Sequence, residues 1–276
     1  MVENFSSWVG RGVTRTDLVT PRLVGEYRAT LEPFLFRPED ERVCPPGIHW
    51  GLAPALPAMT ELGEDGSEAK GLFLPPVSLP RRMWAGGQVE CVGDICLGME
   101  IARRSTISDI RMREGKSGPL CFISLTHEIR SANTLLLRER QDLVFRGGGH
   151  APQPTSTPHE AASGDVEWTV EPTAAMLFRF SAFMFNAHRV HYDVPYAVEG
   201  DGYGGLLVHG PLQAALLLNQ ASRMLGRVAA GMDYRCLAPL VAGSPMAVRT
   251  RRNATGAEGR IVDHQGTLTT EAAVTA

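Results

Sequence analysis

The sequence predicts an α+β fold in which antiparallel strands curl round a buried helix, and three observations support this. Residues 88–145 and 233–273 are two series of apolar, β-favouring segments separated by Gly-containing or charged turns. Residues 211–227 have a helical pattern with almost no charged face over the first four turns, which indicates burial on nearly all sides. A long buried helix followed by consecutive antiparallel strands is typical of a sheet curled round a helix, and two copies would make a double version.

The chain has 276 residues, of which 43% are hydrophobic. It can hold two cores of ordinary size, because domains commonly run to roughly 100–150 residues. Residues 147–164 are rich in Gly, Pro, Ser and Thr and have no periodicity, so we predict a linker or crossing loop. It divides the chain into an N-terminal half, residues 1–146, and a C-terminal half, residues 165–276. No clear internal repeat supports a duplication, which therefore rests on element order.

In the N-terminal half, a helix is predicted over residues 18–31. Thr16 or Asp17 can cap it, and Leu23, Tyr27 and Leu31 are spaced for one face. Residues 44–87 are rich in Pro and Gly, so little regular structure is expected there. Strands are then predicted at residues 88–92, 95–108, 120–130 and 133–145.

In the C-terminal half, the first predicted strands are residues 166–170 and 176–185, and the second leads directly into a loop rich in polar residues. The apolar helix at 211–227 follows. The chain then ends in four predicted strands, at residues 233–239, 245–253, 256–263 and 265–273.

Several classes of protein are disfavoured by composition. The formal net charge of -3 gives no reason to expect a nucleic-acid partner, since polyanion binders carry a basic excess. The N-terminus lacks an export signal and no apolar stretch is long enough to span a bilayer, so we expect a soluble cytoplasmic protein without a membrane partner. The five cysteines are odd in number and contain no CxxC pair, which is typical of reduced cytosolic thiols.

The most informative stretch is residues 185–193, Phe-Asn-Ala-His-Arg-Val-His-Tyr-Asp, which we name the motif loop. Loops that leave a rigid scaffold are where chemistry is usually mounted. His191 can take or give a proton near neutral pH. Asn186 can hold a water molecule or donate a hydrogen bond, but it cannot be a general base. The stretch predicts a site that adds water to, or removes it from, an enoyl thioester, although each of these residues taken alone is more often an ordinary turn residue.

Residues 209–211, His-Gly-Pro, immediately precede the apolar helix. The unpaired backbone N–H groups and the positive dipole end at a helix start favour a developing oxyanion. Gly210 would let a thioester carbonyl come close to the backbone. Gly and Pro also begin helices for conformational reasons alone, so the pattern has two interpretations.

Two further patterns bear on ligands. His188, His191 and Asp193 have a spacing that resembles a metal site, but Pro195 and the loop context give no preorganised face, so no metal is expected. The adjacent Arg81 and Arg82 precede Trp84 and two glycines. Guanidinium groups suit phosphate or carboxylate recognition, so the pair could hold coenzyme A phosphates or a free carboxylate, or it could be a solvated turn.

Residues 177–210 resemble the MaoC-like (type 2 enoyl-CoA hydratase) hot-dog proteins. Their motif, Asp-x-Asn-Pro-(Ile/Leu)-His, corresponds here to residues 186–191, and a Gly-containing turn then opens the central helix. Several blocks together resemble more closely the branch that contains 3-methylfumaryl-CoA (mesaconyl-CoA) hydratase and the mitochondrial-type 3-hydroxyacyl thioester dehydratases. These blocks are residues 49–52, 71–87, 115–120, 139–146, 185–193 and 208–212.

The resemblance implies a double hot-dog fold with two antiparallel sheets each wrapped round a helix, no metal, no organic cofactor, and reversible hydration of an enoyl-CoA. In the family, the motif's aspartate and histidine activate water together; here the aspartate position is Asn186. The implied catalytic residues are His191, Asn186 and Gly210. The implied substrate-binding residues are Arg81, Arg82, Trp84, His188 and His209. Asp193 or Asp142 could instead supply a carboxylate base.

Other functions remain open at this level. The same frame could dehydrate 3-hydroxyacyl chains on CoA or acyl carrier protein in fatty acid or polyketide assembly. A hot-dog thioesterase and a non-catalytic acyl-CoA-binding subunit are further alternatives. Single hot-dog domains pair their sheets by forming dimers, whereas a double hot-dog makes this sheet pairing within one chain. Both a monomer and a homodimer are therefore expected forms.

Overall fold

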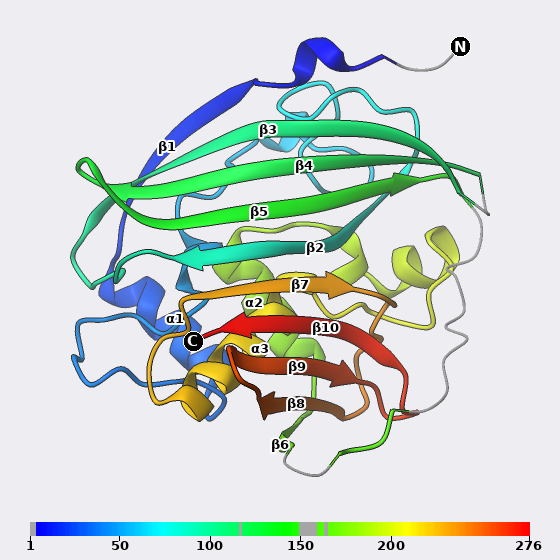
Figure 1. The fold of residues 1–276 in the computed structure, drawn as a ribbon. Helices are drawn as coiled ribbons and strands as arrows, with labels where there is room; N and C mark the ends of the chain where they lie inside the picture. Colours follow the sequence, from blue (N-terminus) through cyan, green and yellow to red (C-terminus); the bar gives the residue numbers. More distant parts are fainter. Residues whose placement is uncertain (1–3, 116–117, 149–158, 163–164) are drawn as a thin grey trace.

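The computed structural model describes residues 4–115, 118–148, 159–162 and 165–276, and these form one long curved antiparallel sheet with helices on its inner side (Figure 1). The strands run in the order β1-β3-β4-β5-β2-β7-β10-β9-β8-β6. Their bounds are β1 Gly12–Leu18, β2 Arg81–Cys91, β3 Glu100–Gly115, β4 Gly118–Ser131, β5 Thr134–Arg146, β6 Val166–Val170, β7 Gly231–Cys236, β8 Met246–Arg252, β9 Gly256–Val262 and β10 Leu268–Thr275. The helices are α1 Pro21–Leu31, α2 Ala174–Met184 and α3 Gly210–Leu225, with short turns at Ser6–Trp8, Ile48–Gly51, Met59–Glu61, Arg189–His191 and Tyr196–Gly200.

The two halves meet where β2 pairs with β7, from Gly86 opposite Arg235 to Glu90 opposite Gly231. The first four strands of the order thus continue into the last five through β2, so that the two expected sheets join edge to edge. A large core cluster crosses this seam and includes residues of both halves, such as Val89 and Met232. The predicted linker lies largely outside the described residues, and the division of the chain into two halves stays a prediction.

Helix α3 is the buried helix that the sequence predicts. Every residue from Pro211 to Ser222 is buried, and the helix packs on β8, β9 and β10. In the N-terminal half, by contrast, β3, β4 and β5 are covered by an irregular segment that contributes Leu74, Val77 and Leu79 to a second, smaller cluster. Helix α1 packs chiefly against α2. The helix enclosed by the curve of the sheet is therefore the one that belongs to the C-terminal half.

Two expectations about individual elements were wrong. Residues 176–185 form most of α2 rather than a strand: the Thr173 Oγ1 atom accepts a bond from Met176 N at 3.2 Å, and Leu177 and Phe180 face the core. A short apolar run has the same composition in a buried helix and in a strand, so periodicity could not separate them.

Residues 81–87 were expected to be irregular and instead begin β2. The two glycines that suggested a loop are needed for close strand approach. A Cβ on Gly86 would lie 2.3 Å from Tyr234 O, and one on Gly87 would lie 2.3 Å from Arg140 O. Glycine inside a strand often marks such a contact between backbones.

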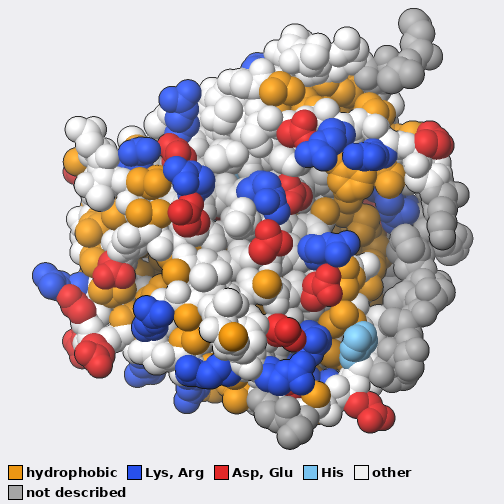
Figure 2. Space-filling view, viewed as in Figure 1, with side chains coloured by type: hydrophobic (Ala, Val, Ile, Leu, Met, Phe, Trp, Pro, Cys, Tyr) orange, Lys and Arg blue, Asp and Glu red, His pale blue; other side chains and the backbone are white. Residues whose placement is uncertain are grey.

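The other predicted elements are confirmed, with shifted ends. The first helix begins at Pro21 rather than at residue 18, because Thr20 caps it and residues 12–18 pair with β3 instead. Basic and acidic side chains are interspersed over the face in Figure 2, without a continuous basic stripe. Within the described residues, no helix is long and apolar enough to cross a bilayer.

Candidate active site

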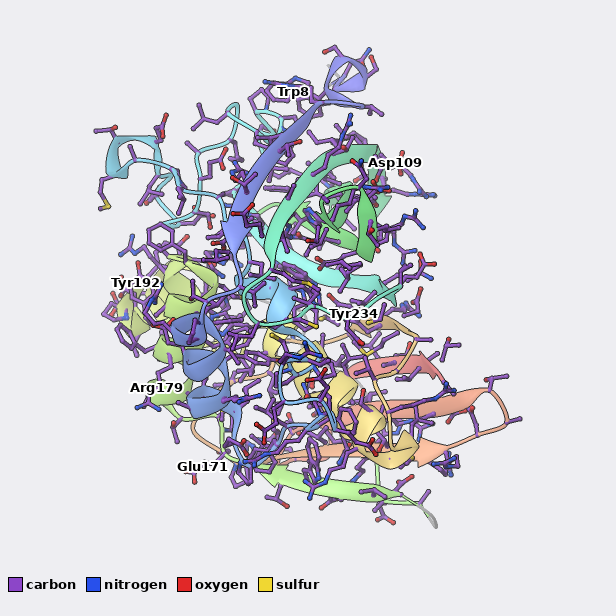
Figure 3. All side chains as sticks on the ribbon, turned by 90° about the vertical axis from the view of Figure 1, so that its left-hand side faces the viewer. Trp8, Asp109, Glu171, Arg179, Tyr192 and Tyr234 are labelled. Carbon is purple, nitrogen blue, oxygen red and sulfur yellow. The ribbon has the colours of Figure 1, made fainter. Side chains whose placement is uncertain are left out.

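A cavity of about 440 Å³ lies at the N-terminal end of α3 and is lined by residues of both halves. From the N-terminal half come Arg82 and Trp84, and from the C-terminal half come Asn186, His191 and Gly210. Figure 3 shows the side chains of this region, with Tyr192 of the motif loop at the molecular surface and Tyr234 of β7 in the interior.

The motif loop begins with a tight reversal at the end of α2. Phe185 adopts a left-handed conformation (φ 51°), which is uncommon for a residue other than glycine. The N–H of Asn186 then bonds to Ser181 O at 2.8 Å, and its side-chain Oδ1 accepts the N–H of His188 at 3.0 Å. This local bonding turns the chain so that the next short helical turn carries His191 into the cavity.

His191 is held in one tautomer. Its Nδ1 atom lies 2.8 Å from Leu207 O, and since a carbonyl oxygen only accepts, Nδ1 carries the proton. The Nε2 atom is therefore the unprotonated nitrogen. Burial lowers the pKa of His191 to about 4, although the bond to Leu207 acts in the opposite direction. At neutral pH this imidazole is uncharged and has a lone pair that can accept a proton.

His209 lies behind His191 and does not line the cavity, although the resemblance implied a role in substrate binding. The two rings are stacked with centroids 3.6 Å apart. The Nε2 atom of His209 lies 2.8 Å from Ser181 Oγ, and Phe180 packs edge-on against the ring. Burial lowers the pKa of His209 well below its usual value, and His191 and His188 lower it further. His209 therefore supports the His191 ring as a neutral imidazole.

Gly210 begins α3 and lines the cavity, as expected. The first N–H groups of a helix have no intrahelical partner, and Pro211 has no N–H, so Gly210 and Leu212 supply the free donors of this turn. A Cβ on Gly210 would lie 3.0 Å from the Trp84 ring. Trp84 is itself fixed, because its Nε1 donates to Tyr234 Oη at 2.9 Å. Glycine thus leaves room for the Trp84 ring to pack against the first turn of α3.

The two adjacent arginines have different surroundings, because consecutive residues of a strand point to opposite faces. Arg82 lines the cavity, and its Nη2 donates to Asp65 Oδ2 at 3.2 Å. Arg81 does not line the cavity; it donates to Gly200 O at 3.2 Å and pairs with Asp201. Of the pair, only Arg82 lies where a substrate would contact it.

His188 also lines the cavity, and its ring is edge-on to that of His191, with centroids 5.5 Å apart. Its Nε2 atom lies 3.9 Å from Asp65 Oδ2. Burial lowers the pKa of His188 to about 3; His191 and Arg82 act in the same direction, and Asp65 opposes them. Asp65 was missed by sequence reasoning, because it lies in a Pro- and Gly-rich stretch with no periodicity to place it.

A second group that sequence reasoning missed forms part of the cavity wall. Arg103 lines the cavity, and its Nη2 atom lies 3.5 Å from Glu139 Oε2. The other carboxylate oxygen of Glu139 accepts Trp50 Nε1–H at 2.9 Å. Burial raises the pKa of Glu139 and lowers the pKa of Arg103, and each is opposed by the charge of its partner. Trp50 and Glu139 fall in two of the blocks that carried the resemblance.

The two alternative carboxylates lie outside the cavity. Asp193 bonds to Arg189 at 2.8 Å and accepts the N–H of Tyr196, as a capping residue does. Asp142 accepts from Ser124 Oγ at 2.7 Å and from Arg140 at 3.0 Å. Neither lines the cavity. Among the residues described, no three His, Cys, Asp or Glu side chains converge as metal ligands would.

The fold and this cavity define a protein of the hot-dog class. Among solved structures, HtdX of Mycobacterium tuberculosis matches with a TM-score of 0.70 and 16% identity, covering 96% of this chain and 99% of that one. A MaoC-like dehydratase matches with a TM-score of 0.72 and 14% identity over 98% and 99% of the two chains. Another M. tuberculosis protein, described as a double hotdog fold, has a TM-score of 0.58 and 12% identity over 97% and 96%. The expected α+β double hot-dog class is confirmed.

Sequence comparison then gives the family. The model of hydroxyacyl-thioester dehydratase type 2 matches residues 47–242, and the chain belongs to that family. It is 37% identical to the mesaconyl-C(4)-CoA hydratase of Chloroflexus aurantiacus, over 91% of this chain and 90% of the relative. It is 32% identical to the mitochondrial hydroxyacyl-thioester dehydratase type 2 of Schizosaccharomyces pombe, over 74% and 76%. The resemblance seen in the motifs is thereby confirmed.

Proposed function

We propose that the protein is a hydro-lyase that reversibly hydrates an enoyl-CoA thioester, with 3-methylfumaryl-CoA (mesaconyl-CoA) as substrate and citramalyl-CoA as product. The observation that carries the proposal is the pairing, in one cavity, of a neutral His191 whose Nε2 is free with the N-terminal turn of α3 at Gly210. The near full-length similarity to a mesaconyl-C(4)-CoA hydratase supports the choice of substrate.

In the hydration direction, His191 Nε2 takes a proton from water as the water oxygen bonds to the β-carbon of the thioester. The electron pair of the double bond moves toward the thioester carbonyl, which becomes an enolate. The free N–H groups at Gly210 and Leu212 stabilise that oxyanion, helped by the dipole of α3. The His191 imidazolium then returns a proton to the α-carbon. The net change is addition of one water, and the net charge stays constant because the imidazolium and the enolate form and disappear together.

In this mechanism Asn186 is a positioning residue and does not act as a base. Its Oδ1 atom is occupied by the N–H of His188, so only its Nδ2–H₂ group remains as a donor. An amide has no accessible proton-accepting state at neutral pH. Asn186 therefore holds the motif loop in shape and presents a donor to the cavity.

Arg82 is suited to bind the free carboxylate of the substrate. In 3-methylfumaryl-CoA this carboxylate is attached to the carbon that water attacks, so its partner must lie close to the histidines. Arg82 lies beside His188 through their shared neighbour Asp65, and one bond to Asp65 leaves further N–H donors for an anion. Arg82 therefore replaces the arginine pair as the proposed carboxylate ligand.

A second candidate is dehydration of 3-hydroxyacyl thioesters carried by CoA or acyl carrier protein. The observation that favours it is the apolar wall of the cavity, which includes Leu125, Leu143 and Leu240 and could receive an alkyl chain. The 32% identity to a mitochondrial dehydratase supports the same alternative. A thioesterase or a non-catalytic acyl-CoA-binding subunit would share the cavity but not the reaction.

We also propose a cytoplasmic location, in keeping with a sequence whose five cysteines are odd in number and contain no CxxC pair. Either a monomer or a homodimer fits the proposal, because the cavity is completed within one chain.

The direct test is to incubate the protein with 3-methylfumaryl-CoA in isotopically labelled water. A hydratase gives a thioester heavier by one labelled water molecule and releases no thiol. Release of free CoA would show a thioesterase instead, and recovery of unchanged, protein-bound substrate would show a binding subunit; either result would contradict the proposal.

A further inference from the structure

A turn of the N-terminal half docks on the motif loop of the C-terminal half. The N–H of Arg189 donates to Asp65 O at 2.8 Å, and the Arg189 guanidinium donates to Glu64 O at 3.1 Å. Gly66, with φ 80°, packs so closely that a Cβ would lie 2.1 Å from Ala187 O. These contacts fix the turn against the loop, and only glycine fits at their centre.

This docking places the Asp65 carboxylate beside His188. Its Oδ1 atom accepts the N–H of Ser67 at 2.9 Å, and its Oδ2 atom accepts Arg82 Nη2–H at 3.2 Å. The same Oδ2 atom lies 3.9 Å from His188 Nε2. The charge of Arg82 and the hydrogen bonds from Ser67 and Arg82 keep the pKa of Asp65 below its usual value despite burial, so the group is a carboxylate at neutral pH. A negative charge is therefore held beside an imidazole that lines the cavity.

We propose that Asp65 is the active-site carboxylate that the motif itself lacks at Asn186, and that it acts through His188. It is a positioning residue: the carboxylate draws the His188 proton to Nε2, which leaves Nδ1 to accept a hydrogen bond from the attacking water. His188 and His191 then hold one water molecule from two sides. The inference rests on the proposed function and deepens it.

A carboxylate can only accept hydrogen bonds, whereas a neutral imidazole has one donor and one acceptor nitrogen. In many acid–base sites a carboxylate that does not touch the substrate fixes the tautomer of a histidine in this way. The 3.9 Å separation is longer than a hydrogen bond and is expected to shorten when substrate binds. His191 alone exchanges protons with water and the α-carbon, so no further acid or base is required.

The structure favours Asp65 over Asp193 and Asp142, the two carboxylates that the sequence left open as a base. Asp193 accepts hydrogen bonds from Arg189 and Tyr196. Asp142 accepts hydrogen bonds from Ser124 and Arg140. Neither contacts a residue that is itself in reach of the reacting atoms, whereas Asp65 adjoins His188, which lines the cavity.

The first test reads the tautomer without any substrate. Nitrogen NMR of labelled imidazoles, with His188 assigned by its absence in His188→Ala, distinguishes a protonated from an unprotonated ring nitrogen. We expect the Nε2–H form of His188 in the wild-type protein and a mixture or reversal in Asp65→Asn, because an amide can present either a donor or an acceptor. Asp193→Asn, a carboxylate-to-amide change in the same loop, should leave the His188 signals unchanged.

The second test is kinetic, with 3-methylfumaryl-CoA. Asp65→Asn should lower kcat by about 100-fold, in the range of a lost acid–base contribution. A change in KM is expected beside it, because Asp65 also bonds to Arg82. In a His188→Ala background the same change should have almost no further effect on kcat, because Asp65 acts on the reaction through that ring. Asp193→Asn should stay within about twofold of wild type, and unfolding temperatures of all variants show whether the fold is intact.

An unchanged His188 tautomer in Asp65→Asn would overturn the inference, whatever the rate. So would a normal rate, or a full additional loss in the His188→Ala background. If the wild-type protein does not turn over 3-methylfumaryl-CoA at all, the proposed function fails, and the tautomer measurement still decides the role of Asp65.

Discussion

The imidazole of His209 lies flat against that of His191, with ring centroids 3.6 Å apart and an interplanar angle of 18°. Two stacked rings at this distance could not both be charged, because like charges at close range strongly disfavour a second ionisation. Burial already keeps the pKa of each below its usual value. The stack therefore holds His191 as a neutral base, and Ser181 fixes the ring behind it.

This arrangement predicts the pH dependence of hydration. The active form of His191 is neutral, and its pKa is lowered to about 4, so kcat/KM should be constant from pH 8 to about pH 6 and should fall only as pH drops through about 4. The measurement is kcat/KM against pH, with each acidic sample returned to neutral pH to show that lost activity is recovered. A half-maximal rate near the ordinary histidine pKa of about 6.5 would contradict this account of His191.

Gly210→Ala should reduce activity. The new Cβ would lie 3.0 Å from the Trp84 ring and would displace either that ring or the first turn of α3, which carries the free N–H groups. Loss of oxyanion stabilisation is expected to lower kcat by about 100-fold. Gly204→Ala is the control, since its Cβ would come no closer than 3.9 Å to Val241. An equal loss of rate in both variants would argue against a specific role for Gly210.

Arg82→Gln should discriminate between substrates. It removes a charge-assisted bond worth about 1.5–3 kcal/mol, so kcat/KM for 3-methylfumaryl-CoA should fall by about 10- to 100-fold. Crotonyl-CoA, which has no second carboxylate, should be affected much less. Arg81→Gln is a matched control, because the neighbouring guanidinium bonds to Gly200 and Asp201 outside the cavity. Parallel losses on both substrates would place the carboxylate elsewhere.

Glu139→Gln should destabilise the fold. Glu139 is 1% exposed and is the charge partner of Arg103, so the change leaves a buried guanidinium uncompensated. The expected loss in free energy of unfolding is about 3–5 kcal/mol, measured by urea denaturation. Glu128→Gln, on the same sheet but in a partly exposed pair with Arg130 and Arg138, should cost less than about 1 kcal/mol. Similar values for the two would show that the Arg103 pair is not buried in solution.

The sequence predicted the sheet and α3 because both carry strong apolar patterns. The motif also selected His191, Asn186 and Gly210, which the structure brings into one cavity, and their catalytic roles stay predictions. It misjudged α2, where a short apolar run has no period that separates helix from strand. It also misjudged residues 81–87, where the glycines required for strand contact were indistinguishable from loop glycines.

The parts of the candidate site that were not predicted are contacts between residues far apart in the sequence. Asp65 meets His188 across more than a hundred residues, from a stretch with no secondary-structure pattern. Arg103 of β3 meets Glu139 of β5 across the intervening strand β4. Arg81 and Arg82 could not be separated either, because the strand that sends them to opposite faces was not predicted. Such relationships depend on register and docking, which local patterns do not encode.

Hydration at this site is tested most directly by the ultraviolet absorbance of the enoyl thioester when the protein is mixed with 3-methylfumaryl-CoA or, separately, with crotonyl-CoA. We expect a rapid loss of the 3-methylfumaryl-CoA signal, a much slower loss with crotonyl-CoA, and no loss of either with His191→Ala. Faster loss with crotonyl-CoA would indicate a general acyl dehydratase. Persistence of both signals, or full activity in His191→Ala, would contradict the proposed hydration at this site.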